Sequence, residues 1–249
     1  MIHFVGAGSG AVDLITVRGD RLLREADIVI YAGSLVNKEL FSITKPECEI
    51  YDSAKMTLDQ VLAVMVPNKE KKIVRLHTGD PSIYGAIREQ MDRLKEEGIE
   101  YEVCPGVSSM CGAAAALKAE YTLPDVSQTV IVTRMAGRTP VPERENIRSL
   151  AAHHATMVIF LSSGMTEKLK AELIAGGYEE TTPCAIVYKA TWPEQKVIRG
   201  VLKELPEMAK ENNITKTALI VVGDFLGDDY ELSKLYDPSF ATEYREASK

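Results

Sequence analysis

Closely spaced metal-ligand side chains are missing from this sequence of 249 residues. Its four histidines show no helical i, i+4 spacing, and its four cysteines include no CxxC pair. Because a protein-bound metal needs several ligands brought together, no metal site is predicted. We interpret the cysteines as small buried hydrophobic side chains or idle thiols. They are Cys48, Cys104, Cys111 and Cys184.

An excess of basic residues is also missing. Lysine and arginine number 29 against 36 acidic residues, which leaves a net charge of −7 and no electrostatic support for binding nucleic acid. No apolar run is long enough to span a membrane, and Met1 leads directly into a predicted strand with no signal peptide. We therefore expect a cytoplasmic globular protein without a nucleic-acid or membrane partner, long enough for one large domain or two small ones.

The most informative stretch is LHTGDPSIYGA at residues 76–86. An apolar run over residues 73–76 predicts a buried strand, and the Gly-Asp-Pro that follows stops it. Asp80 or Ser82 can cap a helix predicted over residues 83–95. In an open α/β sheet such a turn lies at the carboxyl edge, where ligands bind, although an ordinary turn between a strand and a helix has the same pattern.

The start of the chain has a similar pattern. A short apolar strand over residues 2–5 is followed by GAGSGA, whose three glycines allow a ligand to approach the backbone closely. This matches the dinucleotide fingerprint G-x-G-x-x-A, which also requires an acid at the end of the second strand. The second predicted strand, residues 28–31, ends in Ala-Gly-Ser, so a dinucleotide site has little support.

Strands and helices alternate along the whole chain, which predicts an α/β fold. We expect two α/β domains, over residues 1–120 and 121–240, each with a mostly parallel or mixed sheet flanked by helices. The boundary is placed in the non-periodic stretch around Pro124, and the chain after about residue 228 is expected to be a loosely held extension. Helices are predicted over 13–26, 37–42, 57–65, 83–95, 108–119, 143–152, 166–174 and 205–212. Strands are predicted over 2–5, 28–31, 49–51, 73–76, 101–103, 130–133, 157–161, 184–188, 196–200 and 218–222.

Four stretches taken together resemble the tetrapyrrole methylase family in order and spacing. They are VGAGSGAVDLIT at 5–16, ADIVIYAGSLV at 26–36, HTGDPSIYGA at 77–86 and PGVSS at 105–109. The family transfers a methyl group from S-adenosylmethionine to a macrocycle carbon. YAGSLV at 31–36 and TRMAGRTPVP at 133–142 are similar to the branch that methylates C-11 of precorrin-4 or cobalt-precorrin-4 in cobalamin biosynthesis. The resemblance runs from residue 1 to about residue 240.

The resemblance implies that S-adenosylmethionine binds in a cleft between the two domains, largely through backbone contacts. For Ile83 and Leu161 a plain core position is the alternative, and for Ser108 and Ser109 a helix cap is the alternative. The implied cofactor residues are Thr78, Gly79, Asp80, Ile83, Ser108, Ser109, Leu161, Ser162 and Ala190.

A tetrapyrrole substrate carries several carboxylates, so its site requires arginine or lysine. Arg134 and Arg138 are the best candidates, because a planar guanidinium pairs with a carboxylate through two hydrogen bonds. Gly8, Ser9 and Tyr31 are assigned to the substrate side, with Tyr31 either in the core or hydrogen-bonded to substrate. Weaker candidates are Arg75, Lys38 and Lys189. The family also implies a homodimer.

Two departures from the family pattern bear on function. Ser9, Ala11 and Val12 replace residues that stiffen the first loop in relatives. Uroporphyrinogen methylases carry an acid after the tyrosine of the second strand, whereas Ala32 stands here, which argues against that activity. Diphthine synthase, which has the same fold, and a regulatory module that senses a nucleotide are competing hypotheses. No catalytic residue is assigned, because methyl transfer from a sulfonium depends mainly on alignment and exclusion of water.

Overall fold

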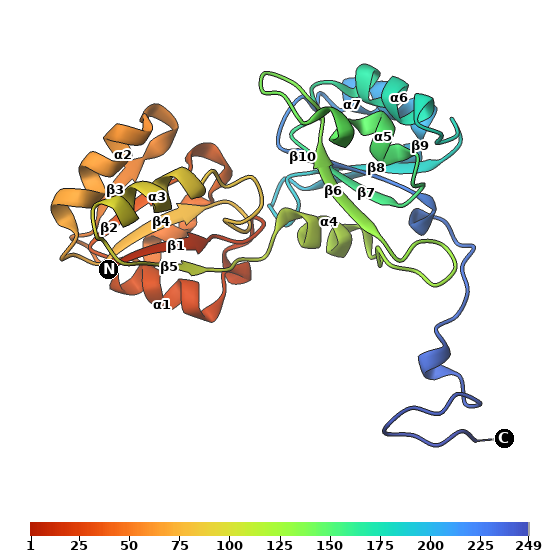
Figure 1. Ribbon diagram of the computed structural model, residues 1–249, viewed down its shortest axis with the longest axis horizontal. Helices are drawn as coiled ribbons and strands as arrows, with labels where there is room; N and C mark the ends of the chain where they lie inside the picture. The colour runs from red at the N-terminus through yellow and green to blue at the C-terminus, as the bar shows by residue number, and fades with distance from the viewer. Residues whose placement is uncertain (249) are drawn as a thin grey trace. The chain divides into compact units, whose positions relative to one another are not determined.

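The computed structural model describes residues 1–248, which divide into two compact units (Figure 1). The first unit comprises Met1–Ala116 together with Lys189–Lys196, and the second comprises the rest of the described chain. The short segment Lys189–Lys196 therefore packs with the first unit, although in the sequence it lies between two strands of the second. The two contiguous domains expected from the sequence, residues 1–120 and 121–240, do not include this return of the chain to the first unit.

The first unit contains a parallel five-stranded sheet in the order β3-β2-β4-β1-β5. Its three central strands are almost entirely buried, because helices cover both faces, and this explains their runs of valine and isoleucine. The strands are β1 (Ile2–Gly6), β2 (Ile28–Tyr31), β3 (Glu49–Asp52), β4 (Ile73–His77) and β5 (Tyr101–Cys104).

Alternate residues of these strands enter two separate cores. One core contains Val5, Val29 and Val74 and is covered by α1 (Val17–Glu25) through Leu23. The other contains strand residues such as Phe4, and is covered by α2 (Leu58–Met65) and α3 (Arg88–Glu96). Figure 1 shows α1 on one side of the sheet and the other two helices on the opposite side.

Two basic residues of β4, Arg75 and His77, lie on the face covered by α2 and α3. Arg75 is buried and donates from Nε to Gln90 Oε1 at 3.0 Å and from a terminal nitrogen to the carbonyl of Ile30 at 3.1 Å. Burial lowers its pKa to about 10, so the guanidinium stays charged at neutral pH. The prediction of Arg75 as a weak candidate for substrate binding is therefore wrong, because its buried side chain joins the sheet to α3.

The second unit contains a mixed five-stranded sheet in the order β6-β7-β10-β8-β9. β6 and β7 are parallel, and β10 is antiparallel to both β7 and β8. Helices α5, α6 and α7 bury Ile147, Leu173 and Leu205 in a core with strand residues Met157 and Ile220. The elements are β6 (Val130–Arg134), α5 (Ile147–Ala151), β7 (Thr156–Phe160), α6 (Thr166–Ala175), β8 (Pro183–Tyr188), β9 (Lys196–Val201), α7 (Leu205–Glu211) and β10 (Ala218–Val222).

The predicted α/β fold, with two mostly parallel or mixed sheets flanked by helices, is confirmed, and several boundaries differ. The helix expected over 83–95 begins only at Arg88, because Tyr84 (φ 56°) and Ala86 (φ 49°) adopt left-handed backbone angles in the preceding turns. The helix expected over 13–26 begins at Val17, where the Thr16 hydroxyl accepts from the N–H of Gly19. Within residues 1–248, no helix is long and apolar enough to cross a membrane.

We expect buried His77 to make stability fall at acidic pH. Burial, with a smaller contribution from the charge of Arg75, lowers its pKa from 6.5 to about 3. The unfolded chain therefore takes up this proton first as pH falls, so the stabilisation is complete above pH 6.5 and is lost towards pH 3. Urea denaturation should show wild type losing about 1 kcal/mol per pH unit more than His77→Gln between pH 6 and 4. Exposed His153→Gln is the control; an equal slope for wild type and His77→Gln would contradict the expectation.

Candidate functional site

The candidate site lies at the carboxyl edge of the parallel sheet, where β1 and β4 are neighbours. The chain leaving β1 leads to α1 on one face, and the chain leaving β4 leads to α3 on the other. Such a reversal opens a crevice at the ends of two adjacent strands, which is where open α/β sheets bind ligands. The predicted glycine turns thus occupy the edge expected from the sequence.

Backbone contacts between glycines hold these turns together. Gly8 and Gly79 exchange two hydrogen bonds, with N–H to carbonyl distances of 3.3 and 2.8 Å. A Cβ on Gly6 would lie 2.5 Å from the carbonyl oxygen of Gly79 and 2.6 Å from the Cα of Gly106. No larger residue fits at Gly6 without separating the turns, so three chain segments meet through bare backbone.

The carboxylate of Asp80 links two of these turns. One oxygen accepts from the N–H of Gly106 at 2.8 Å, and the other accepts from both the N–H and the hydroxyl of Ser82. Partial burial raises the pKa of Asp80, but these hydrogen bonds outweigh it and leave the pKa below its usual value. Asp80 is therefore an ionised structural group with both oxygens occupied.

The first turn of α4 (Ser109–Leu117) lies against Gly79. A Cβ on Gly79 would be 3.3 Å from the nitrogen of Ser109 and 3.5 Å from the Cα of Ser108. The carbonyl of Ser108 accepts from the N–H groups of Cys111 and Gly112, so Ser108 begins the helix. Ser108 and Ser109, two of the predicted cofactor residues, therefore lie against the turn formed by Thr78, Gly79 and Asp80.

The segment Lys189–Lys196 closes over the first glycine loop. The hydroxyl of Thr191 hydrogen-bonds the hydroxyl of Ser9 at 3.0 Å and accepts from the N–H of Ala11 at 3.1 Å. A Cβ on Gly10 would collide with the ring of Trp192. Ala190 is buried there, and its contact with the cofactor stays a prediction. The sequence did not identify Thr191, and the only signal for it was its position next to the predicted site residue Ala190.

Two buried polar atoms near the edge have no hydrogen-bond partner among the described residues: the hydroxyl of Thr78 and Nε2 of His77. Buried polar groups are normally satisfied, so an unpaired hydroxyl in a ligand-facing turn fits contact with a polar ligand. The peptide groups of Gly79 are already paired with Gly8, so among the side-chain atoms of this turn the Thr78 hydroxyl is the one that the described residues leave unsatisfied. This first unit therefore suits a polar cofactor such as S-adenosylmethionine.

The other predicted site residues lie in the second unit. Arg134 donates to the carbonyls of Met135, Thr139 and Pro140, so it holds its own loop in shape. Arg138, in that loop, is exposed. The hydroxyl of buried Ser162 donates to Phe160 O and accepts from Met135 N, and its carbonyl accepts from the N–H of Met165.

Leu161 stands out because it combines exposure with an unusual backbone. Its side chain is 64% exposed and its φ is 51°, a left-handed angle that costs a non-glycine residue about 1 kcal/mol. Strain of this kind persists at functional sites when the surroundings hold it in place. Leu161 is not a core residue, so the alternative interpretation from the sequence is wrong.

Packing accounts for the burial of two further predicted residues. The ring of Tyr31 lies 4.8 Å from that of Phe41 and beneath the amine of Lys38. The N–H of Ala54 and, to a smaller extent, the Tyr31 hydroxyl lower the pKa of the Asp52 carboxyl. Half-buried Ile83 donates its N–H to the carbonyl of Asp80. Their ligand roles stay predictions. Among residues 1–248, no three histidine, cysteine or acidic side chains are grouped to hold a metal ion.

We expect Asp80→Asn to weaken cofactor binding more than it lowers the rate at saturating cofactor. The asparagine side chain would place its NH2 group, which cannot accept a hydrogen bond, against the N–H of Gly106 or against Ser82. The loss of one hydrogen bond to this turn should cost about 1–3 kcal/mol of stabilisation. Calorimetry with S-adenosylmethionine measures the affinity, and exposed Asp59→Asn is the matched control. Normal affinity with a rate lowered by orders of magnitude would instead identify Asp80 as a catalytic base.

Comparisons with known proteins point to one family. The model of the tetrapyrrole (corrin/porphyrin) methylases matches residues 1–206. A cobalt-precorrin-4 C(11)-methyltransferase of Methanocaldococcus jannaschii is 55% identical, covering 100% of this chain and 97% of that protein. A protein of the same name from Priestia megaterium is 46% identical, covering 100% and 98%. A solved cobalt precorrin-4 methyltransferase superposes with a TM-score of 0.89 at 48% identity, covering 91% of this chain and 96% of the other. The chain therefore belongs to the tetrapyrrole (corrin/porphyrin) methylase family.

Proposed function

We propose that this protein methylates C-11 of cobalt-precorrin-4, with S-adenosylmethionine as the methyl donor. The observation that carries the proposal is full-length similarity to two relatives of that name, at 55% and 46% identity. The glycine-lined sheet edge and the arginine-bearing loop of residues 134–140 supply the features that such a reaction needs. Precorrin-4 without cobalt is the second candidate substrate, because its macrocycle offers the same carboxylates to the same basic residues.

The proposed cofactor site follows the close-packed edge of the first unit. Thr78, Gly79 and Asp80 form the turn that receives the cofactor, with the unpaired hydroxyl of Thr78 as its free polar group, and Ser108 and Ser109 border this turn. Ala190 lies beside the first glycine loop, where the hydroxyl of Thr191 is hydrogen-bonded to that of Ser9. When bound there, S-adenosylmethionine supplies a methyl group on a sulfonium. Proposed contacts of the second unit are the exposed side chain of Leu161 and the backbone of Ser162.

The residues of this edge are suited to positioning rather than to proton transfer. The Asp80 carboxylate is occupied on both oxygens and has a lowered pKa, so it is a weak base. His77 has a pKa of about 3 and is buried. Neither group would remove a proton efficiently at neutral pH. The chain would therefore accelerate the reaction mainly by aligning the two reactants and excluding water.

The proposal also covers assembly, location and partners. The protein acts as a homodimer in the cytoplasm, as its family resemblance implies. Light scattering on the purified protein should give twice the mass of one chain, and a monomer mass would remove the dimer from the proposal. The substrate is a small tetrapyrrole, and neither nucleic acid nor a membrane takes part.

Transfer of label from S-adenosylmethionine tests the activity. The protein is incubated with labelled cofactor and, separately, with cobalt-precorrin-4, precorrin-4 and uroporphyrinogen III. We expect label in the first substrate, at C-11 by NMR of the product. Label only in uroporphyrinogen III would indicate the other family activity, and label in none of the three would contradict a tetrapyrrole substrate and favour diphthine or a sensing role.

We expect Arg138→Ala to weaken tetrapyrrole binding while leaving cofactor binding unchanged. Arg138 is exposed in a loop whose shape Arg134 maintains, so its guanidinium is available to a carboxylate. Loss of one water-accessible, charge-assisted contact should raise the KM for the tetrapyrrole about ten-fold, or about 1.4 kcal/mol. Exposed Arg144→Ala is the matched control. Equal losses for both ligands would make Arg138 structural.

A further inference from the structure

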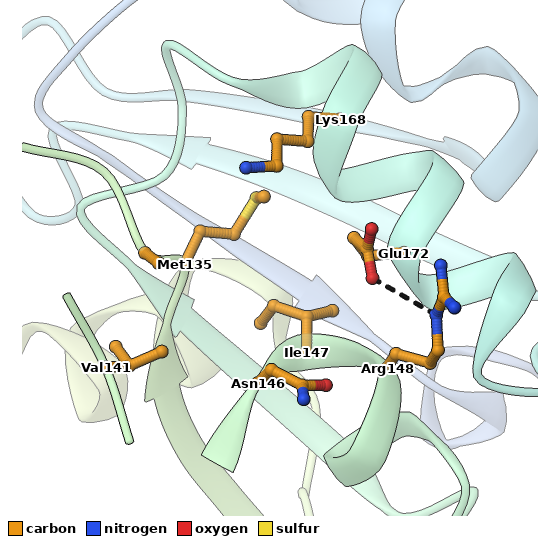
Figure 2. A pocket seen from close by; sticks show the side chains of 8 residues that line it. Met135, Val141, Asn146, Ile147, Arg148, Lys168 and Glu172 are labelled. Atoms are coloured by element: carbon orange, nitrogen blue, oxygen red, sulfur yellow. Dashed lines mark ion pairs between the residues drawn. The ribbon is translucent and has the colours of Figure 1, made fainter. Parts of the chain in front are cut away.

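A pocket of about 390 Å³ opens within the second unit, between the loop that follows β6 and helices α5 and α6 (Figure 2). Three apolar side chains, Met135, Val141 and Ile147, line one part of it. Charged side chains from the two helices line the rest. This volume is within the range of small-molecule sites, and the proposed cofactor and substrate residues do not line the pocket.

One positive charge in this pocket is unbalanced. Arg148 and Glu172 form an ion pair, with Nε 3.3 Å from the carboxylate, so their charges cancel. Lys168 enters no hydrogen bond or ion pair with any other residue in the described part of the chain. Figure 2 shows its amine directed across the pocket towards Met135 and away from the Arg148–Glu172 pair. The pocket therefore combines one available cation with an apolar wall, in a chain whose net charge is −7.

The remaining polar side chain of the pocket is already occupied. Asn146 accepts from the N–H of Ser149 at 2.8 Å through Oδ1, and its Nδ2 donates to the carbonyl of Glu143. A phosphate would require several free donors around its oxygens, and the pocket does not offer them. One cation beside an apolar wall instead suits a short aliphatic chain that ends in a single carboxylate.

The walls of the pocket are held in place by contacts that need no ligand. Met135 follows β6 directly, and its N–H donates to the buried hydroxyl of Ser162 at 2.9 Å. Arg134 fixes the following residues through the carbonyls of Thr139 and Pro140. A site that is already shaped loses little conformational entropy on binding. The pocket also adjoins the loop of Arg138, at the carboxyl ends of the parallel strands β6 and β7.

We propose that this pocket receives a carboxylate-bearing side chain of the tetrapyrrole. Lys168 pairs with the carboxylate, and Met135, Val141 and Ile147 contact the methylene groups that carry it. The inference rests on the proposed function for its ligand, and it adds a second anchoring cation to Arg138. Binding at both points would fix the rotation of the macrocycle in its own plane, and therefore which carbon is presented for methylation.

The test compares Lys168→Gln with Lys170→Gln on the full-length protein. Both lysines lie on α6, but Lys170 pairs with Glu167 at 3.1 Å and does not line the pocket. Affinity for cobalt-precorrin-4 is measured by absorbance titration without cofactor, and affinity for S-adenosylmethionine by calorimetry. We expect Lys168→Gln to weaken tetrapyrrole binding about five- to ten-fold with unchanged cofactor affinity, and Lys168→Arg and Lys170→Gln to stay within about two-fold.

A further variant tests the charge balance from the opposite direction. Glu172→Gln removes the partner of Arg148 and adds a second available cation, so tetrapyrrole binding should tighten about two- to five-fold. An unchanged affinity of Lys168→Gln for cobalt-precorrin-4, or an equal loss of affinity in Lys170→Gln, would overturn the inference. Methyl transfer by the wild-type protein would still support the proposed function in that case. If wild type binds the tetrapyrrole but does not methylate it, the proposed function fails, and the two lysine variants still decide the pocket.

Discussion

The packing of three bare backbone segments at one sheet edge is the constraint on which the rest of the site depends. Gly6, Gly79 and Gly106 lie so close that a Cβ on the first or last would overlap a neighbouring peptide group. Asp80 reinforces the contact by accepting from Gly106. Because side chains are excluded at these contacts, the relative positions of the three segments depend on the fold rather than on rotamers.

This arrangement explains why the candidate site contains few side chains of obvious catalytic type. A site built from peptide groups is rigid and polar, which suits the alignment of a charged cofactor but supplies no proton acceptor. The ionisable groups nearby are committed to structure: Arg75 links the sheet to α3, and His77 is held neutral by burial. The substrate carboxylates are proposed to bind basic residues of the second unit, where Arg138 and Lys168 have no neutralising partner within residues 1–248.

The predictions from sequence were most successful where the signal was local. β10 and the capped helix α2 lie where they were expected, because valine and isoleucine runs and a Thr57 cap depend only on near neighbours. The start of α3 was wrong, because the left-handed angles of Tyr84 and Ala86 arise from how the turn packs. Thr191 was missed for a related reason: its partners, Ser9 and Ala11, are far away in the sequence.

The sequence by itself determined the α/β class, the glycine turns at the ends of β1 and β4, and the family to which the chain belongs. These follow from residue order, since strand runs, turn residues and motif spacing need no knowledge of distant contacts. Only the tertiary structure decided that Lys189–Lys196 packs with the first unit, that Arg134 maintains a loop while Arg138 stays exposed, and that Lys168 lacks a partner among the described residues. Those properties depend on which groups meet in space. Arg134 and Arg138 are of the same type and close in the sequence, yet within residues 1–248 only Arg134 is hydrogen-bonded to its own loop. Lys168 and Lys170 are equally close, yet only Lys170 has an acidic partner among the described residues.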